Sequence, residues 1–252
     1  MKRNRAQKQQ RQQADQYDPR FESNVINIDR RLNEKRRRVQ IYPKNLSQET
    51  YLLKLNDSQK KILFAIGPAG TGKTMLAVQW AVDQLKFGAA EKIIITRPAV
   101  SVDEEHGFLP GDLNEKMAPW TKPIFDVFAE NFNAKEIAHM IEEGVIETSP
   151  LAYMRGRTFK NAVVIADEMQ NATPSQMKML LTRIGEGSRM VVTGDLAQAD
   201  RPKANGLLEF CSLYTEGGEH RMVAMAKFET KDIERHPVVK EILSIYKELD
   251  SE

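Results

Sequence analysis

Cysteine and long apolar runs are the two features this sequence most clearly lacks. Its 252 residues include one cysteine, Cys211, which excludes an intrachain disulfide and a cysteine-rich zinc site. No stretch approaches the roughly 18 uncharged apolar residues of a membrane-spanning helix. The basic start at residues 1–5 has no apolar segment behind it, so we do not expect it to be a secretory signal. We therefore expect a cytoplasmic protein with no membrane partner.

A strong overall charge is also missing, but the net charge of +2 conceals an asymmetry. Residues 1–40 carry twelve basic and five acidic residues, a net +7, whereas the rest carries 25 basic and 30 acidic residues, a net −5. Residues 1–20 are also rich in glutamine and poor in large apolar side chains, which favours disorder. We expect residues 1–44 to be a basic, partly disordered extension. It is either a solvated tail or an arm that contacts nucleic acid or a neighbouring subunit.

Residues 45–252 have the composition of one folded α/β domain. Short apolar runs at 62–66, 92–96, 162–166 and 190–193, with a weaker one at 222–225, have the length of strands. They are apolar at consecutive positions, which is typical of parallel strands covered on both faces. Strands that alternate with helical segments predict a three-layer fold with a mainly parallel central sheet.

Three helices and one irregular segment complete this prediction. A helix is expected from Thr74 to Leu85, and a last helix near Pro237. Between them, Thr173 and Gln176 form a capping-box pattern that begins a helix, and Gly185 is expected to end it. Residues 98–160 contain five prolines and are expected to be a long irregular insertion.

Residues 67–74 fit the phosphate-binding pattern G-x-x-x-x-G-K-[ST] in full. The segment reads Gly67-Pro68-Ala69-Gly70-Thr71-Gly72-Lys73-Thr74. It follows an apolar strand and opens a helix, which is the context that lets backbone N–H groups and the helix N-terminus bind phosphates. Lys73 would reach the β- and γ-phosphates, and the Thr74 hydroxyl would bind Mg²⁺. The alternative is a chance glycine-rich turn.

Two further strands deliver polar residues at their carboxyl ends. The run at 162–166 is followed by Asp167, a candidate ligand of the magnesium shell, and Glu168, a candidate base that would polarise an attacking water. The run at 190–193 leads through Gly194 and Asp195 to Gln198, which would orient water or sense the γ-phosphate. The plainer interpretations are solvated acids at the start of a loop and a polar turn.

Taken together, these motifs resemble the PhoH family over roughly residues 45–250. The matching segments are 67–74, 96–98 (TRP), 107–112 (GFLPGD), 151–158 (LAYMRGRT), 167–171 (DEMQN), 181–185 (LTRIG), 193–195 (TGD) and 232–237 (DIERHP). The resemblance implies an ATPase that uses ATP and Mg²⁺, with a core similar to one RecA-like domain of superfamily 1 helicases. The family is named for induction under phosphate starvation, and members also occur in phages.

The resemblance also implies how the ATP site is completed. Arg183 or Arg235 is a candidate arginine finger, supplied across a subunit boundary; for each, the alternative is a surface salt bridge. A superfamily 1 helicase closes its site with a second RecA-like core. One core therefore implies either a homo-oligomer, expected as a hexameric ring, or a weak ATPase.

A candidate surface for RNA or single-stranded DNA combines arginines with aromatic residues. Arginines neutralise phosphates and aromatics stack on bases. The candidates are Arg97, Phe108, Trp120, Tyr153, Arg155 and Arg157. Alternatively, the aromatics pack in the core, and Arg155 and Arg157 pair with acids such as Asp103, Glu104 or Glu105 or contribute to the nucleotide site.

Three functions compete at this point. The first is an ATP-dependent remodeller or helicase acting on RNA or single-stranded DNA. The second is an ATPase that regulates or assembles a protein partner without separating strands. The third is a nucleotide-binding switch or small-molecule kinase, which Glu168 disfavours because it supplies a base for hydrolysis.

Overall fold

A computed structural model describes residues 38–98, 113–199, 205–235 and 237–245. Most of the predicted basic extension, the 107–112 motif and the candidate Phe108 lie outside the described residues.

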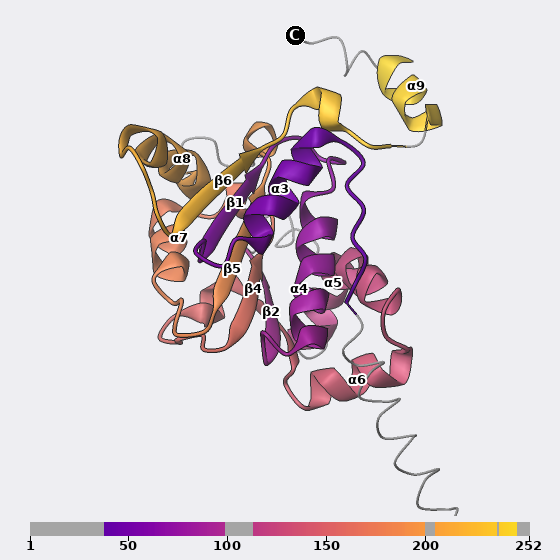
Figure 1. The fold of residues 1–252 in the computed structure, drawn as a ribbon, viewed down its shortest axis with the longest axis vertical. Coiled ribbons are helices and arrows are strands. Elements are labelled where there is room, and N and C mark those ends of the chain that lie inside the picture. Colours follow the sequence, from indigo (N-terminus) through magenta and orange to yellow (C-terminus); the bar gives the residue numbers. More distant parts are fainter. Residues whose placement is uncertain (1–37, 99–112, 200–204, 236, 246–252) are drawn as a thin grey trace, which may run out of the picture. The chain divides into compact units, whose positions relative to one another are not determined.

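The described chain forms one six-stranded parallel sheet (Figure 1). In chain order the strands are β1 (Ile62–Ile66), β2 (Lys92–Arg97), β3 (Ile146–Pro150), β4 (Ala162–Ala166), β5 (Arg189–Gly194) and β6 (Val223–Lys227). Their order across the sheet is β3-β2-β4-β5-β1-β6. Every pairing is parallel, and four of the five predicted strands agree with the structure to within about one residue, whereas β6 runs to Lys227, two residues beyond the predicted 222–225.

Successive residues of every strand except β3 point into two separate apolar cores. Leu63 and Ala65 of β1 pack under helices α3 (Leu46–Asn56), α4 (Lys73–Phe87) and α5 (Leu113–Ala129). Phe64 and Ile66 pack on the other face, under α7 (Pro174–Leu181), α8 (Gly206–Glu216) and the 3₁₀ turn η2 (Leu151–Met154). Burial on both faces explains the uninterrupted apolar strands and confirms the three-layer prediction.

The prediction that residues 98–160 are irregular was wrong for their described part. This segment holds α5, α6 (Ala134–Glu142) and β3. Helix α5 contains Pro119 and Pro123, yet its Ile124, Val127 and Phe128 are buried against the α4 side of the core. Tertiary packing therefore outweighs the helix-breaking tendency of proline.

Helix α7 begins as predicted and ends earlier than predicted. Thr173 and Gln176 form the reciprocal capping box, but the helix stops at Leu181 and not at Gly185. The chain leaves the helix because Ile184 forms a parallel bridge with Phe159, whose N–H donates to Arg183 O at 2.8 Å. Gly185 is needed there, since a Cβ would lie 2.4 Å from the Phe159 carbonyl oxygen.

The last described helix, α9 (Pro237–Ile245), begins where proline predicts it. Short turns connect the remaining elements: η3 (Met169–Asn171), η4 (Leu196–Gln198) and η6 (Thr230–Asp232). Among the described residues, no helix combines the length and apolar character needed to cross a membrane.

Candidate nucleotide site

The candidate site lies where β1, β4 and β5 end. These strands are neighbours in the sheet, so their carboxyl ends meet at one edge, which is where open α/β sheets bind ligands. A cavity of about 240 Å³ opens there. Its lining consists of Ala69, Gly70, Gly72, Lys73, Thr74, Met75, Asp167, Glu168, Thr193, Gly194, Asp195 and Gln198.

The phosphate loop, residues 67–74, runs from β1 into α4. Gly72 occupies the N-cap of α4 in a left-handed conformation, with φ of 83° and no side chain to cap the helix. The first N–H groups of α4 are therefore left for a ligand, and the helix dipole adds partial positive charge. Both features suit a phosphate group.

Lys73 folds back on the phosphate loop. Its Nζ donates to the carbonyl oxygens of Gly67 and Pro68, both at 2.6 Å, and to Thr71 Oγ1 at 3.3 Å. Burial lowers the pKa of Lys73, and the nearby carboxylates of Asp195, Glu168 and Asp167 partly oppose that shift. An incoming phosphate would offer this ammonium a stronger, charged acceptor than the carbonyls.

Asp167 connects three segments of the site, which are the start of α4, the end of β4 and the end of β5. Its Oδ1 accepts hydrogen bonds from Thr74 Oγ1 at 2.7 Å and from Thr193 Oγ1 at 2.5 Å. Asp167 is buried, and its backbone N–H donates to Thr96 O at 2.9 Å. Hydroxyl and carboxylate oxygens are the ligands that Mg²⁺ prefers, so Thr74 and Asp167 fit that ion.

Glu168 has an unusual backbone conformation. Its φ of 53° and ψ of 41° lie in the left-handed region, which is strained for a residue with a side chain. Gln170 Nε2 donates to Glu168 Oε2 at 2.5 Å, and Gln170 Oε1 accepts from the Asp195 N–H at 3.2 Å. Gln170 thus connects the Glu168 carboxylate, which follows β4, to the Asp195 backbone at the end of β5.

Asp195 contacts the phosphate loop directly. Its Oδ2 accepts from the Ala69 N–H at 3.2 Å, and its Oδ1 accepts from the Ala197 N–H at 3.0 Å. The latter bond caps η4, at whose end Gln198 lies exposed on the rim of the cavity. The structure therefore brings the phosphate loop, Asp167, Glu168 and Gln198 together, as the sequence predicted.

Sequence reasoning missed the contribution of α3. Gln48 is buried and donates from Nε2 to Thr71 O at 3.1 Å, while its Oε1 accepts from the Lys44 N–H at 2.8 Å. The Tyr51 hydroxyl donates to Lys73 O at 3.4 Å. A polar residue inside a helix gives no sequence signal that it supports a loop 23 positions away.

The segment after β6 crosses the phosphate loop. We call residues 228–235 the strap. The Glu234 N–H donates to Gly70 O at 3.0 Å, and the Arg235 side chain packs so closely that a Cβ at Gly70 would meet its Nε at 2.5 Å. Asn45 Nδ2 also donates to Asp232 O at 3.2 Å. Arg235 therefore lies beside the phosphate loop of its own chain.

Arg183 lies elsewhere. Its Nε donates to Met179 O at 3.2 Å and a terminal nitrogen donates to Arg157 O at 3.4 Å, so in this chain it packs on the η2 side of α7. It is not among the residues that line the nucleotide cavity.

The nucleic-acid candidates have different surroundings. Arg157 forms a two-pronged ion pair with Glu147, the second prong at 2.7 Å, and lies over the Phe159 ring. The sequence had suggested other acids as partners. Tyr153 within η2 and Arg155 directly after it are exposed, and Arg97 is half-buried at the end of β2.

Trp120 is half-buried in α5. Tyr153 and Arg155 are therefore the two described candidates that present their side chains to solvent.

A doubly covered parallel sheet with this loop, lysine and Asp-Glu pair defines the P-loop NTPase fold of the RecA-like type. The characteristic pattern of the family described as "PhoH-like protein" matches residues 40–247. The chain belongs to the PhoH family.

Relatives in several bacteria support this assignment. A PhoH-like protein of Bacillus subtilis (strain 168) is 47% identical over 206 residues, which cover 81% of this chain and 63% of that protein. Protein PhoH of Escherichia coli (strain K12) is 40% identical over 210 residues, covering 82% and 58%. The chain thus spans about three fifths of the length of these relatives.

Among solved structures, the crystal structure of Pif1 helicase from Candida albicans is similar with a TM-score of 0.35 and 16% identity. The match covers 75% of this chain and 41% of that chain.

Proposed function

We propose that the chain is a Mg²⁺-dependent ATPase that remodels RNA or single-stranded DNA. One observation carries the hydrolytic part. Asp167 accepts from the hydroxyl that follows the phosphate-loop lysine, and Glu168 stands next to it, held by Gln170. A binding protein needs the phosphate loop, whereas hydrolysis also needs a positioned base.

Each group of residues in the site has its own role in the proposed reaction. The N–H groups at the start of α4 bind the phosphates, and Lys73 exchanges its loop carbonyls for phosphate oxygens. Thr74 and Asp167 hold Mg²⁺, which neutralises phosphate charge when bound. Glu168 accepts a proton from the attacking water, and Gln198 orients that water from the rim of the cavity.

Arg235 is the better placed of the two candidate arginine fingers for action within one chain. It already packs on Gly70 of the phosphate loop, where a guanidinium would act on a bound phosphate. Arg183 donates to Met179 O and Arg157 O and does not line the nucleotide cavity, so any contact with a nucleotide would be made in a neighbouring copy.

A nucleic-acid substrate is supported by the exposed Tyr153 and Arg155 and by the basic residues 1–40. The single core favours a homo-oligomer, with a hexameric ring as the expected form. The second candidate is an ATPase that regulates or assembles a protein partner; its discriminator is the net charge of −5 over the rest of the chain, which does not by itself favour nucleic acid.

Turnover of ATP with RNA, with single-stranded DNA and without either tests the proposal. We expect nucleic acid to stimulate phosphate release at low salt, and Lys73→Ala to abolish it. Glu168→Gln should still bind ATP while hydrolysis falls by about 10²–10⁴-fold. Stimulation by a protein partner alone would support the second candidate, and unchanged turnover in Glu168→Gln would remove Glu168 as the base.

A further inference from the structure

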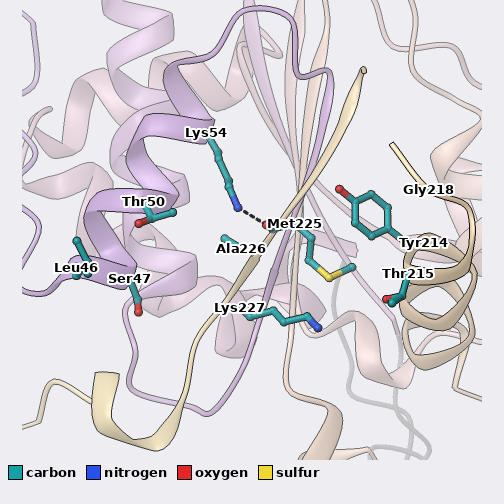
Figure 2. A pocket seen from close by; sticks show the side chains of 10 residues that line it. All are labelled: Leu46, Ser47, Thr50, Lys54, Tyr214, Thr215, Gly218, Met225, Ala226 and Lys227. Atoms are coloured by element: carbon teal, nitrogen blue, oxygen red, sulfur yellow. Dashed lines mark hydrogen bonds between the residues drawn. The ribbon is translucent and has the colours of Figure 1, made fainter. Parts of the chain in front are cut away.

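A second cavity of the described chain, larger than the nucleotide site, lies along the β6 edge of the sheet. We call it the edge groove; its volume is about 560 Å³. Strand β6 forms its floor, α3 one wall and the end of α8 the other (Figure 2). Five of its ten lining residues are exposed: Leu46, Thr50, Thr215, Gly218 and Lys227. A small-molecule site buries about 70–90% of its ligand, so this open groove suits a polymer that passes along it.

The edge groove is lined by two lysines and by no acidic residue. Lys54 Nζ donates to Met225 O at 2.5 Å, a neutral carbonyl that leaves its charge unpaired. The Lys227 side chain has no hydrogen bond or ion pair with the described residues. Burial and the nearby Lys60 ammonium lower the pKa of Lys54, so a third cation lies close to this edge. Positive charge that no lining carboxylate neutralises attracts an anion.

Hydroxyl groups add neutral donors to the two ammonium groups. Ser47 and Thr50 contribute theirs from α3, and Tyr214 and Thr215 from the end of α8. Thr215 Oγ1 donates to Cys211 O at 2.9 Å. The hydroxyls of Ser47, Thr50 and Tyr214 make no hydrogen bond with the described residues. Lysine ammonium and hydroxyl groups are the side-chain donors that bind the phosphates of nucleic acids.

The aromatic ring of the edge groove already packs against other rings. Tyr214 is the aromatic member of the lining, and its ring centroid lies 4.4 Å from that of His220 and 6.3 Å from that of Phe210. Figure 2 shows its hydroxyl pointing toward β6. The groove therefore offers donors for phosphates and not a stacking platform, so we expect contacts that depend little on base sequence.

A peptide that extends the sheet is disfavoured as the occupant. An edge strand offers free backbone groups to another strand. Here Lys54 Nζ binds the carbonyl of Met225, the central residue of β6, as the dashed line in Figure 2 shows. A pairing strand would have to displace this lysine, whereas a phosphate could accept from its remaining N–H groups.

The elements that form the edge groove also hold the phosphate loop. From the buried face of α3, Gln48 Nε2 donates to Thr71 O at 3.1 Å. Strand β6 continues into the strap, whose Glu234 N–H donates to Gly70 O at 3.0 Å. A ligand that contacts α3 and β6 therefore acts on two elements that bond directly to the loop.

We propose that the edge groove binds the sugar–phosphate backbone of a single strand of RNA or DNA, and that this contact stimulates ATP turnover. The inference rests on the proposed function, because it names a surface on which the remodelled strand lies. That surface is separate from Tyr153 and Arg155, which follow β3 at the opposite edge of the sheet. RNA and DNA should bind the groove alike, since phosphates are common to both.

Binding of a fluorescein-labelled oligouridylate to the full chain, measured by anisotropy at several salt concentrations, tests the groove. Lys227→Gln removes one phosphate contact. We expect the dissociation constant at low salt to rise about threefold or more, and the slope of log affinity against log salt to become shallower by about 0.7. Lys227→Arg keeps the charge and should restore both values. Lys135→Gln is the matched control, because it removes one charge from an exposed lysine on α6, outside the groove, and should keep the wild-type slope.

Thr50→Glu is an independent variant that places a carboxylate in the groove. Its position on α3 is exposed and glutamate favours helix, so folding should be preserved, which circular dichroism checks. We expect weaker binding than in the wild type. Unchanged affinity in both Lys227→Gln and Thr50→Glu, or an equal loss in Lys135→Gln, would overturn the proposal. Displacement of the oligouridylate by polyglutamate as readily as by unlabelled oligothymidylate would assign the groove to an acidic protein partner instead.

ATP turnover separates the failure of this inference from the failure of the proposed function. We expect the oligouridylate to stimulate Thr50→Glu less than the wild type at equal oligonucleotide concentration. Stimulation of Lys227→Gln and Thr50→Glu to the wild-type extent at every concentration would defeat the groove alone. A wild type that binds the strand in the groove, as judged by these variants, but hydrolyses no ATP would defeat the proposed function alone.

Discussion

The Gln170 side chain donates to Glu168 Oε2 at 2.5 Å while the Glu168 backbone is left-handed, with φ of 53°. The hydrogen bond fixes the direction of a carboxylate whose backbone is already constrained. Because strain of this kind persists only where the surroundings enforce it, Gln170 is a positioning residue for Glu168.

Gln170→Ala should therefore reduce turnover more than binding. We expect kcat to fall by about tenfold or more, because the proposed base Glu168 loses its orientation, with ATP affinity nearly unchanged. Gln176→Ala is the control. It removes one half of the α7 capping box, the bond that Gln176 Oε1 accepts from the Thr173 N–H, and should lower the free energy of unfolding by about 1 kcal/mol without changing kcat. A Gln170→Ala enzyme with wild-type kcat would contradict the positioning role.

Thr193→Val tests whether the hydrogen bond from the Thr193 hydroxyl stabilises Asp167. The change preserves shape but removes the donor that bonds Asp167 Oδ1 at 2.5 Å in a buried position. We expect the free energy of unfolding to fall by about 1–3 kcal/mol, and Mg²⁺-dependent ATP binding to weaken. Thr193→Ser keeps the hydroxyl and should behave nearly as the wild type. Chemical denaturation and titration calorimetry measure the two effects.

Gly67→Ala tests the close contact between the phosphate loop and the strap. Gly67 has φ of 149°, and a Cβ there would lie 2.4 Å from Phe228 O. Gly88 also has a positive φ, of 79°, but has open space around it. We expect Gly88→Ala to lower the free energy of unfolding by about 1 kcal/mol, from backbone strain alone. Gly67→Ala should lower it by about 1–3 kcal/mol more, because the strap must move.

ATP affinity should fall at alkaline pH because of Lys73. Burial lowers the pKa of Lys73 below the ordinary 10.5, so the free protein loses this proton as pH rises through the lowered value. The phosphates require the charged form, so binding must then take up one proton. Affinity should decline by up to about tenfold per pH unit, beginning below 10.5. Fluorescence titration across pH measures it; Lys73→Ala should bind weakly and show no such decline.

Arg155 and Arg157 should respond differently to alanine substitution. Arg155 is exposed, so Arg155→Ala is expected to weaken RNA binding at low salt and to leave stability within about 0.5 kcal/mol. Arg157 pairs with Glu147 and covers Phe159, so Arg157→Ala should lower the free energy of unfolding by about 1–2 kcal/mol. Filter binding and thermal denaturation separate the two. Equal RNA affinity for Arg155→Ala and the wild type would remove Arg155 from the proposed surface.

The sequence alone was sufficient to predict the elements that depend on interactions between neighbouring residues. The apolar strand at 62–66, the loop at 67–74 and the acids after 162–166 each follow from neighbouring residues. Parallel strands bring their carboxyl ends to one edge, so the approximate meeting of Lys73, Asp167 and Glu168 was predictable too.

Only the tertiary structure decided the contacts between distant segments. Gln48 supports Thr71, Arg235 packs on Gly70, and Thr193 shares Asp167 with Thr74, at separations in sequence that leave no periodic signal. The same reason explains the errors in the predicted elements. Proline-containing α5 persists because its apolar face is buried, and α7 ends early because Ile184 bridges to Phe159. The secondary-structure propensity of a segment contains no information about a distant residue that contacts and stabilises it only after folding.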